Sequence, residues 1–304
     1  MKIGEPNPMS LRTAVIIATK GRPQEVSVLL ETLDLQTVLP DVIVVSTCDA
    51  SDIEQNIVGK RNLHILFGPA GLPAQRNRAL SLIRDSADIV VFFDDDFIPS
   101  RFWIERIQLL FATLADVGTV TGRVLADGVT AGGLPKTEGQ SIVNKADLSE
   151  KMPTPSTYST QINSPYGCNM AFRIKNIEGL MFDERLALYG WLEDLDFGLR
   201  AGMRGGMIST DLVWGVHLGV QGARSSGIRF GYSQVVNPWY LMKKGLITRF
   251  DACRRICRGL AGNAIKLIVS QKSHVDRRGR LKGNIIGIKD IMIGKWLPEK
   301  VAEL

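Results

Sequence analysis

The sequence has 304 residues, 45% of them apolar and 22% charged, which excludes a disordered tail and is enough for one large or two ordinary domains. No apolar run approaches the roughly 20 residues that a membrane-spanning helix needs, residues 1–10 lack the pattern of a secretory signal, and the four cysteines include no Cys-x-x-Cys pair. The net charge of +6 is uneven, because residues 243–304 hold 15 Lys or Arg against 5 Asp or Glu. We therefore expect a cytoplasmic protein with a cationic C-terminal segment.

Short β-branched segments alternate with helical patterns from residue 13 to about residue 124, which is typical of βαβ units around a mostly parallel sheet. The predicted strands are residues 13–18, 42–45, 63–67, 88–93 and 117–124. The pattern fades over residues 127–165, where we expect a functional loop. Ordered structure resumes at residue 166, a helix is predicted over residues 192–203, and basic helices follow residue 234.

Three adjacent carboxylates, Asp94, Asp95 and Asp96, follow the most apolar predicted strand. In a parallel α/β sheet, the carboxyl end of a strand opens onto the ligand crevice. Because adjacent carboxylates repel one another, a proton or a cation must relieve them, and Mg²⁺ or Mn²⁺ suits all-oxygen ligands. The pattern predicts a divalent cation that bridges carboxylates to a substrate phosphate. The alternative is a solvated acidic turn that caps the next helix.

Glu193 and Asp194 form a second acidic site, about 100 residues further along the chain. They fall in the first turn of a predicted helix, so helix capping is one interpretation. The other is a division of labour in which one acidic site holds a metal and the second accepts a proton. Arg76 and Asn77, at a turn that opens a helix, are candidates for phosphate binding or for an exposed basic face. His217, after an apolar segment, is either structural or a ligand.

Five segments, in order, resemble motifs of family 2 glycosyltransferases. They are the strand and nucleotide loop at residues 15–23, a Gly…Ala-Arg-Asn-like segment at residues 71–80, an Asp-x-Asp motif at residues 92–96, an acceptor-side strand at residues 167–173 and a Glu-Asp motif at residues 193–200. The resemblance spans about residues 13–220. It implies a GT-A fold, that is, a Rossmann-like α/β fold with a mostly parallel sheet flanked by helices. It also implies a nucleotide-sugar donor, a divalent metal and inversion at the anomeric carbon.

The resemblance further implies roles for individual residues. Asp194 would be the general base that takes the proton from the acceptor hydroxyl. The metal would be held by Asp94, Asp96 and His217, the donor would be bound by Thr19, Arg22, Asp49, Arg76, Asn77, Asp94 and Asp95, and the acceptor by Asn169, Trp191 and Glu193. Many relatives carry an Asp just after the second strand that reads the nucleotide base. Here Val45 leads into Ser-Thr-Cys before Asp49, which leaves the identity of the nucleotide open.

Together these features predict an inverting, metal-dependent hexosyl- or deoxyhexosyltransferase. Its acceptor would be a glycan or a lipid-linked oligosaccharide, in bacterial surface or exopolysaccharide assembly, and the lack of a Gln-x-x-Arg-Trp motif favours single addition over polymerisation. One alternative is a nucleotidyltransferase, against which the lack of a Gly-rich phosphate loop after the first strand counts. The other is a non-catalytic basic module that binds membrane or nucleic acid. We expect no nucleic-acid partner, because no recognisable motif for one is present.

We divide the chain into a catalytic domain over residues 1–232 and a basic helical extension over residues 233–304. The nucleotide-sugar half would cover about residues 1–125 and the acceptor half about residues 126–232. In the extension, residues 241–269 mix apolar residues with Lys and Arg, as expected of a helix that lies on anionic lipid. This predicts peripheral binding to the inner face of a membrane. The alternative is a solvated helical cap packed on the catalytic domain.

Overall fold

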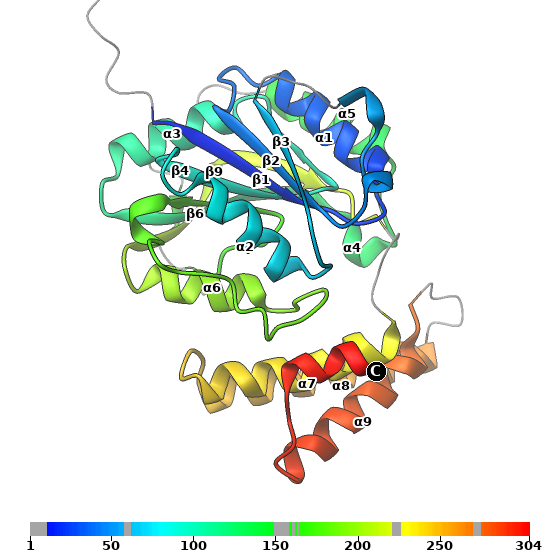
Figure 1. The fold of residues 1–304 in the computed structure, drawn as a ribbon. Coiled ribbons are helices and arrows are strands. Elements are labelled where there is room, and N and C mark those ends of the chain that lie inside the picture. The colour runs from blue at the N-terminus through cyan, green and yellow to red at the C-terminus, as the bar shows by residue number, and fades with distance from the viewer. Residues whose placement is uncertain are drawn as a thin grey trace, which may run out of the picture.

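The structure is a computed structural model that describes residues 11–57, 62–148, 158–159, 162, 164–220, 226–269 and 275–304. It confirms the predicted α/β fold. A twisted nine-stranded sheet is flanked by helices, and the C-terminal helices form a further layer beneath it in the view of Figure 1.

The sheet has the order β3-β2-β1-β4-β8-β6-β9-β5, and β7 pairs with β9 outside this path. The strands are β1 (Thr13–Ala18), β2 (Val42–Thr47), β3 (Leu63–Phe67), β4 (Ile89–Asp94), β5 (Phe97–Pro99), β6 (Val117–Asp127), β7 (Tyr158–Ser159), β8 (Asn169–Arg173) and β9 (Gly206–His217). Neighbours from β3 to β4 are parallel, as are β6 and β9, whereas β8 runs antiparallel to both β4 and β6. The predicted strands are therefore confirmed, with shifts of a few residues at their ends.

Both faces of the sheet are covered, which explains why β4 is apolar from Ile89 to Phe93. The helices are α1 (Pro23–Asp34), α2 (Leu72–Ile83), α3 (Trp103–Thr113), α4 (Gly128–Ala131), α5 (Lys136–Leu148), α6 (Glu193–Gly202), α7 (Gly227–Lys243), α8 (Arg249–Val269) and α9 (Arg277–Met292), with short 3-10 segments η1 (Ala50–Asp52), η2 (Gln55–Ile57), η4 (Ile174–Asn176) and η5 (Pro298–Glu303). Val91 and Phe93 pack in the cluster that contains α1 and α3, and Val90 and Phe92 in the one that contains α2 and α6. Every residue of β4 before Asp94 is thus held in the core.

The loop expected over residues 127–165 is wrong in its first part, because α4 and α5 occupy it. The buried positions of α5 are Gly139, Val143 and Asp147. Asp147 accepts hydrogen bonds from Ser100 Oγ at 2.7 Å and from Trp214 Nε1 at 3.0 Å. An inward position of α5, where an apolar side chain is usual, is thus taken by a carboxylate. The sequence of α5 therefore lacks the apolar period that predicts a helix. Residues 149–157 lie outside the described residues.

The basic helices predicted after residue 234 are confirmed as α7, α8 and α9. Gly231 and Gly283 let α7 and α9 approach closely, because a Cβ on either glycine would lie 2.0 Å from a backbone oxygen of the facing helix. The bundle packs on α6 through a cluster that includes Leu195 and Leu241 (Figure 1). The predicted domain boundary after residue 232 falls inside α7, and the division into domains stays a prediction. Within the described part of the chain, no helix has both the length and the hydropathy that crossing a bilayer requires.

Candidate active site

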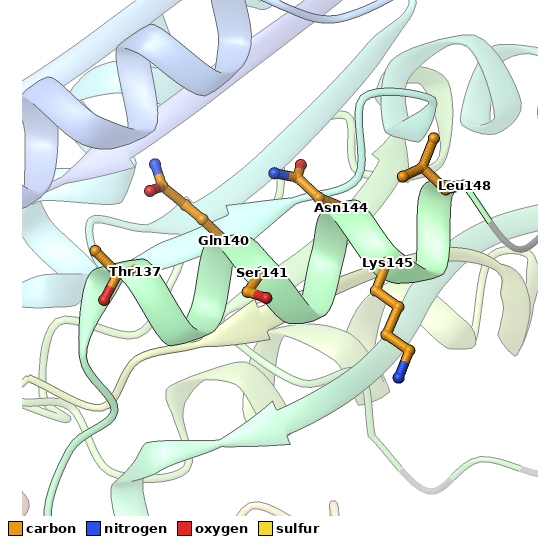
Figure 2. Close-up of a pocket in the computed structure, with 6 residues that line it drawn as sticks. All are labelled: Thr137, Gln140, Ser141, Asn144, Lys145 and Leu148. Atoms are coloured by element: carbon orange, nitrogen blue, oxygen red, sulfur yellow. The ribbon is translucent and has the colours of Figure 1, made fainter.

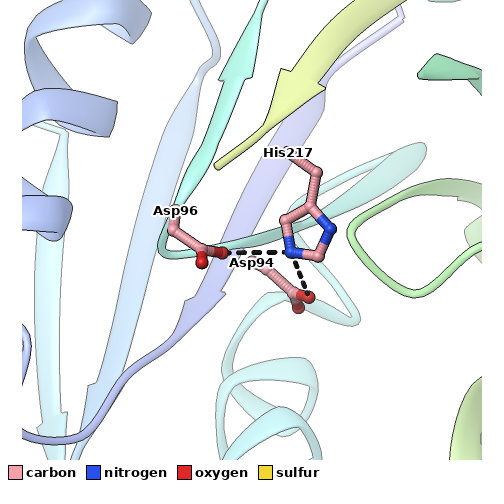
Figure 3. Close-up of side chains that lie close together, drawn as sticks. All are labelled: Asp94, Asp96 and His217. Carbon is pink, nitrogen blue, oxygen red and sulfur yellow. Dashed lines mark ion pairs between the residues drawn. The ribbon is translucent and has the colours of Figure 1, made fainter. Parts of the chain in front are cut away.

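The site begins where β4 ends in Asp94, at the carboxyl edge of the sheet. The chain turns there and returns as β5, which pairs with β9 so that Phe97 lies opposite His217. This register brings His217 to the acids: its Nε2 is 3.2 Å from Asp96 Oδ1 and 3.9 Å from Asp94 Oδ2 (Figure 3). One ligand atom from each of the three residues lies within 4.8 Å of the others. The three residues predicted to hold a metal are therefore neighbours.

The second nitrogen of His217 faces a carboxylate that the sequence analysis missed. Asp127, the last residue of β6, places Oδ1 3.3 Å from Nδ1 of His217 and accepts a hydrogen bond from Tyr166 Oη at 2.7 Å. Burial lowers the pKa of His217, but the pairing with Asp127 and Asp96 outweighs it and raises the pKa to about 10. The position of Asp127 at the carboxyl end of a strand is the signal that could have revealed it.

Asp95 points to a different set of partners from those of Asp94. It accepts hydrogen bonds from Thr19 Oγ1 and from Arg22 Nη1, both at 2.8 Å. Burial raises the pKa of Asp95, and the charge of Arg22 opposes that shift. Arg22 Nη1 also lies 3.6 Å from Asp96 Oδ2. Three predicted donor-binding residues therefore form one cluster beside the candidate metal ligands.

Arg76 connects the two acidic sites. Its side chain is only 2% exposed, and its guanidinium lies over the rings of Phe92 and Phe182. Nη2 donates to Asp94 Oδ1 at 2.9 Å, while Nη1 forms a short ion pair with Glu193. Side chains that are about 100 residues apart in sequence thus share one buried cation. This cation leaves Asp94 Oδ2 to face His217.

Asp194 lies beside this cluster, in the first turn of α6. Its oxygens accept hydrogen bonds from the backbone N–H groups of Gly167, at 3.1 Å, and Leu195, at 2.8 Å. Burial raises its pKa, and the charge of Asp94 acts in the same direction. Glu193 is bound to Arg76 and so does not cap the helix; burial raises its pKa to about 8, against the attraction of Arg76. Glu193 Oε2 is buried and has no hydrogen-bond partner among the described residues.

Two predicted site residues have amides that bind other parts of the protein. Asn77 donates to the backbone oxygen of Phe182 at 3.0 Å and accepts from its N–H at 2.7 Å. Asn169 is fully buried, accepts from Thr121 Oγ1 at 2.8 Å and donates to Gly122. The contacts of Asn77 fix the segment around Phe182, which precedes α6, and those of Asn169 join β8 to β6, so both amides face partners within the fold.

Asp49 and Trp191 also contact other parts of the protein. The exposed Asp49 accepts from the N–H and hydroxyl of Ser51, and thus caps the short helix η1. Its buried neighbour Asp52 holds the loop after β2, because it accepts from Thr47 Oγ1 and from the N–H of Gly21, both at 2.6 Å. Trp191 packs at 6.0 Å from the ring of Phe230, at the edge of the C-terminal bundle.

Two hollows lie near the sheet. One of about 700 Å³ runs along α5, and its lining among the described residues consists of Thr137, Gln140, Ser141, Asn144, Lys145 and Leu148 of that helix (Figure 2). A smaller pocket of about 170 Å³ reaches Asp95 and Asp96 between α1 and the start of β5. The larger hollow is lined by none of the predicted site residues, whereas Asp95 and Asp96 line the smaller one.

Compared by sequence, the chain matches no protein-family model and no curated protein. Its structure is similar to crystal structures of S. aureus TarS 1–349. The form in complex with UDP-GlcNAc is 16% identical, with a TM-score of 0.57, over 97% of this chain and 84% of that one. The structure without a named ligand is 15% identical, with a TM-score of 0.55, over 97% and 83%.

The TarS 1–349 complex with UDP has a TM-score of 0.52 at 15% identity, over 86% of this chain and 76% of that one. The chain spans 40% of the length of a longer TarS structure that it also matches. At these identities the likeness establishes the fold alone. The chain therefore has the predicted GT-A, Rossmann-like architecture.

Proposed function

We propose that the protein is an inverting glycosyltransferase that moves one sugar from a nucleotide-sugar to an acceptor hydroxyl. The observation that carries this proposal is Arg76, which joins the candidate metal ligand Asp94 to Glu193, the neighbour of Asp194. One buried cation thereby holds the candidate donor site next to the neighbour of the candidate base, as a single displacement needs. UDP-sugars are the first donors to test, because TarS structures with this fold contain UDP and UDP-GlcNAc.

Asp94, Asp96 and His217 fit a divalent cation. They offer two carboxylates and an imidazole nitrogen within 4.8 Å, and the contact of Nδ1 with Asp127 leaves Nε2 for the ligand role. Mn²⁺ or Mg²⁺ bound there would neutralise the charge that develops on the departing diphosphate. On the other side of Asp96, Arg22 supplies a fixed positive charge next to Asp95.

Asp194 would take the proton from the acceptor hydroxyl as the oxygen attacks the anomeric carbon on the face opposite the diphosphate. The backbone N–H groups of Gly167 and Leu195 hold its two oxygens, so the carboxylate is oriented before the acceptor arrives. A raised pKa makes Asp194 a stronger base than an ordinary aspartate. Arg76 fixes Glu193 beside it.

The remaining assignments are part of the same proposal. Thr19 and Arg22 would line the donor side, with Asp95 as their anchor. Trp191 and Glu193 would line the acceptor side, which we propose receives a hexosyl or deoxyhexosyl group on a glycan or lipid-linked oligosaccharide of a bacterial surface polysaccharide.

The base assignment is tested by Asp194→Asn. The amide keeps the size of the side chain but cannot accept the proton, so transfer should fall at least 100-fold while UDP binding with Mn²⁺ stays within about twofold. Asp211→Asn, on the exposed part of β9, is the matched control and should leave both unchanged. Turnover in Asp194→Asn at the rate of the unaltered protein would contradict the assignment.

Calorimetry tests the proposal as a whole. UDP, GDP and dTDP are each titrated with and without Mn²⁺. Tighter binding of one nucleotide in the presence of Mn²⁺ is the expected result. If none of the three bound in a metal-dependent way, the glycosyltransferase proposal would be rejected.

A further inference from the structure

Helix α8 carries its large apolar side chains on the outside of the molecule. Phe250 is 75% exposed, Ile265 59% and Ile268 80%, whereas the buried residues of this helix are Ala252 and Asn263. Burying side chains of this size releases about 1.5–3 kcal/mol each, so their exposure leaves a substantial free energy of binding unused. Apolar patches of this kind mark interaction sites.

Six of the exposed residues lie on one face of the helix, because each is three, four or seven positions from another of the six. We call this face the α8 stripe: Phe250, Arg254, Cys257, Arg258, Ile265 and Ile268. Its opposite face contacts α7 and α9, through Asn263 among others, which bonds to Asn284 of α9 and Gln234 of α7. The stripe is therefore the side of α8 that faces away from the bundle.

Charge identifies the kind of surface that the stripe fits. Helix α8 contains five Lys or Arg and one Asp, a net charge of +4, and the acid lies outside the stripe. Arg254 and Arg258 lie within the stripe, and Arg254 makes an exposed contact with Asp251 at 3.7 Å, which water screens. A second copy of the chain would bring two helices of +4 face to face, so the charge opposes self-association through this face.

We propose that the α8 stripe binds an anionic phospholipid bilayer. Phe250, Ile265 and Ile268 would enter the boundary between headgroups and acyl chains, while Arg254 and Arg258 extend their long side chains to the lipid phosphates. The helix would lie in the plane of the membrane surface. The sequence pattern indicated a lipid-facing helix in residues 241–269, and the structure assigns the face.

Sedimentation with vesicles tests the proposal on the full chain. Vesicles of phosphatidylcholine alone are compared with vesicles that contain 30% phosphatidylglycerol, an anionic fraction of roughly the kind found in cell membranes. We expect binding to the anionic vesicles only, and its loss at about 0.5 M salt, where charges are screened beyond a few ångströms. Equal binding to both kinds of vesicle, or none to either, would overturn the proposal.

Two double variants separate the apolar and the cationic contributions. Phe250→Ser with Ile268→Ser should weaken binding at least tenfold, and Arg254→Gln with Arg258→Gln by about 25-fold, since each cation near an anionic surface contributes about fivefold. The matched control is Leu109→Ser with Lys175→Gln, which removes an exposed apolar residue and an exposed cation from the catalytic part. All of these side chains are exposed, so the variants should fold, as a thermal melt can check. A control that loses as much binding as the stripe variants would refute the assignment.

Two further measurements test whether a second copy of the chain covers the stripe and whether nucleotide binding is independent of it. If a second copy of the chain covered the stripe, light scattering at increasing protein concentration would show dimers, and Ile268→Ser would dissociate them. That result would replace the lipid proposal. UDP binding is measured on the same variants and should not change, because the stripe lies on α8 and the acids at the edge of the sheet. A chain that binds anionic vesicles but no nucleotide would reject the proposed enzyme activity and keep the membrane surface.

Discussion

Asp127 decides which nitrogen of His217 faces the acids. Its carboxylate lies 3.3 Å from Nδ1 and is itself held by the hydroxyl of Tyr166 at 2.7 Å. A carboxylate behind a histidine ligand fixes the ring orientation and raises its basicity, and the loss of such a partner typically costs 10- to 100-fold in metal affinity. Asp127 is therefore expected to act as a positioning residue.

Asp127→Ala should weaken Mn²⁺ binding about 10- to 100-fold in calorimetry of the protein without nucleotide. Asp127→Asn retains an oxygen that can accept from Nδ1–H, so its affinity should lie between those of the alanine variant and the unaltered protein. This graded order indicates a positioning role, because general damage to the fold would not make Mn²⁺ affinity depend on whether residue 127 can accept a hydrogen bond. Unchanged Mn²⁺ affinity in Asp127→Ala would show that Asp127 has no such role.

The pKa of Asp194 predicts the acidic limb of the pH profile. A base works only when deprotonated, and burial raises the pKa of Asp194 above the ordinary value of about 4. As the pH falls through the raised pKa, kcat/KM should drop tenfold per pH unit, and the decline should begin at a higher pH than for an exposed aspartate. The profile is measured at saturating Mn²⁺. A limb centred at or below about pH 4 would contradict the burial of this carboxylate in the working enzyme.

At the scale of elements, one cation secures the C-terminal bundle to α6. Lys244 Nζ, just after α7, lies 2.7 Å from Asp183 Oδ2 and in short contact with Asp196, a fully buried residue of α6. Arg200 is the second partner of Asp196. Deletion of the chain from residue 243 would therefore remove α8, α9 and a partner of a buried carboxylate, so membrane binding is better tested with exposed stripe residues.

Lys244→Met should lower the free energy of unfolding by roughly 1–3 kcal/mol, because Asp196 keeps Arg200 but loses a charged donor. Urea denaturation measures the change. Lys243→Met, at the neighbouring exposed position, is the control and should stay within about 0.5 kcal/mol of the unaltered protein. Equal stability of the two variants would mean that Lys244 does not hold the bundle to α6.

The sequence predicted those elements whose packing depends on apolar side chains. Strand β4 reads as a strand because both of its faces are buried in apolar clusters. Helix α5 escaped prediction because Asp147, bonded to Ser100 and Trp214, takes an inward position. A carboxylate can take this inward position only because its partners, 47 and 67 residues away in sequence, bond to it. No local sequence pattern predicts such contacts.

Prediction of the candidate site follows the same rule. Asp94, Asp96 and His217 were predicted together, and the pairing of β5 with β9 places them together. Asn77 and Asn169 have the residue types of ligand-binding groups, yet their amides bind backbone across the fold. Asp127 was missed since its role depends on a contact with a strand end 90 residues away in the sequence. Residue type predicts chemistry, but only long-range contacts decide which polar groups remain available for it.

On the scale of the whole molecule, the cationic part of the chain and the acids of the candidate site lie in different layers of the structure. The excess of cations lies in residues 243–304, which hold 15 Lys or Arg against 5 Asp or Glu, and the acids of the candidate site lie at the edge of the sheet. Helix α6 stands between the two, since its Leu195 packs against the bundle and its Asp194 against Gly167. A bilayer on the α8 stripe would therefore be separated from the acids by a layer of protein.

The sharing of Arg76 limits how this protein can be redesigned. Replacement of Glu193, which we propose to line the acceptor side, would remove one of the two ion pairs of the guanidinium and leave the one with Asp94. We therefore expect a change on the proposed acceptor side to affect the proposed metal site as well. A library that varies position 193 should vary position 76 too.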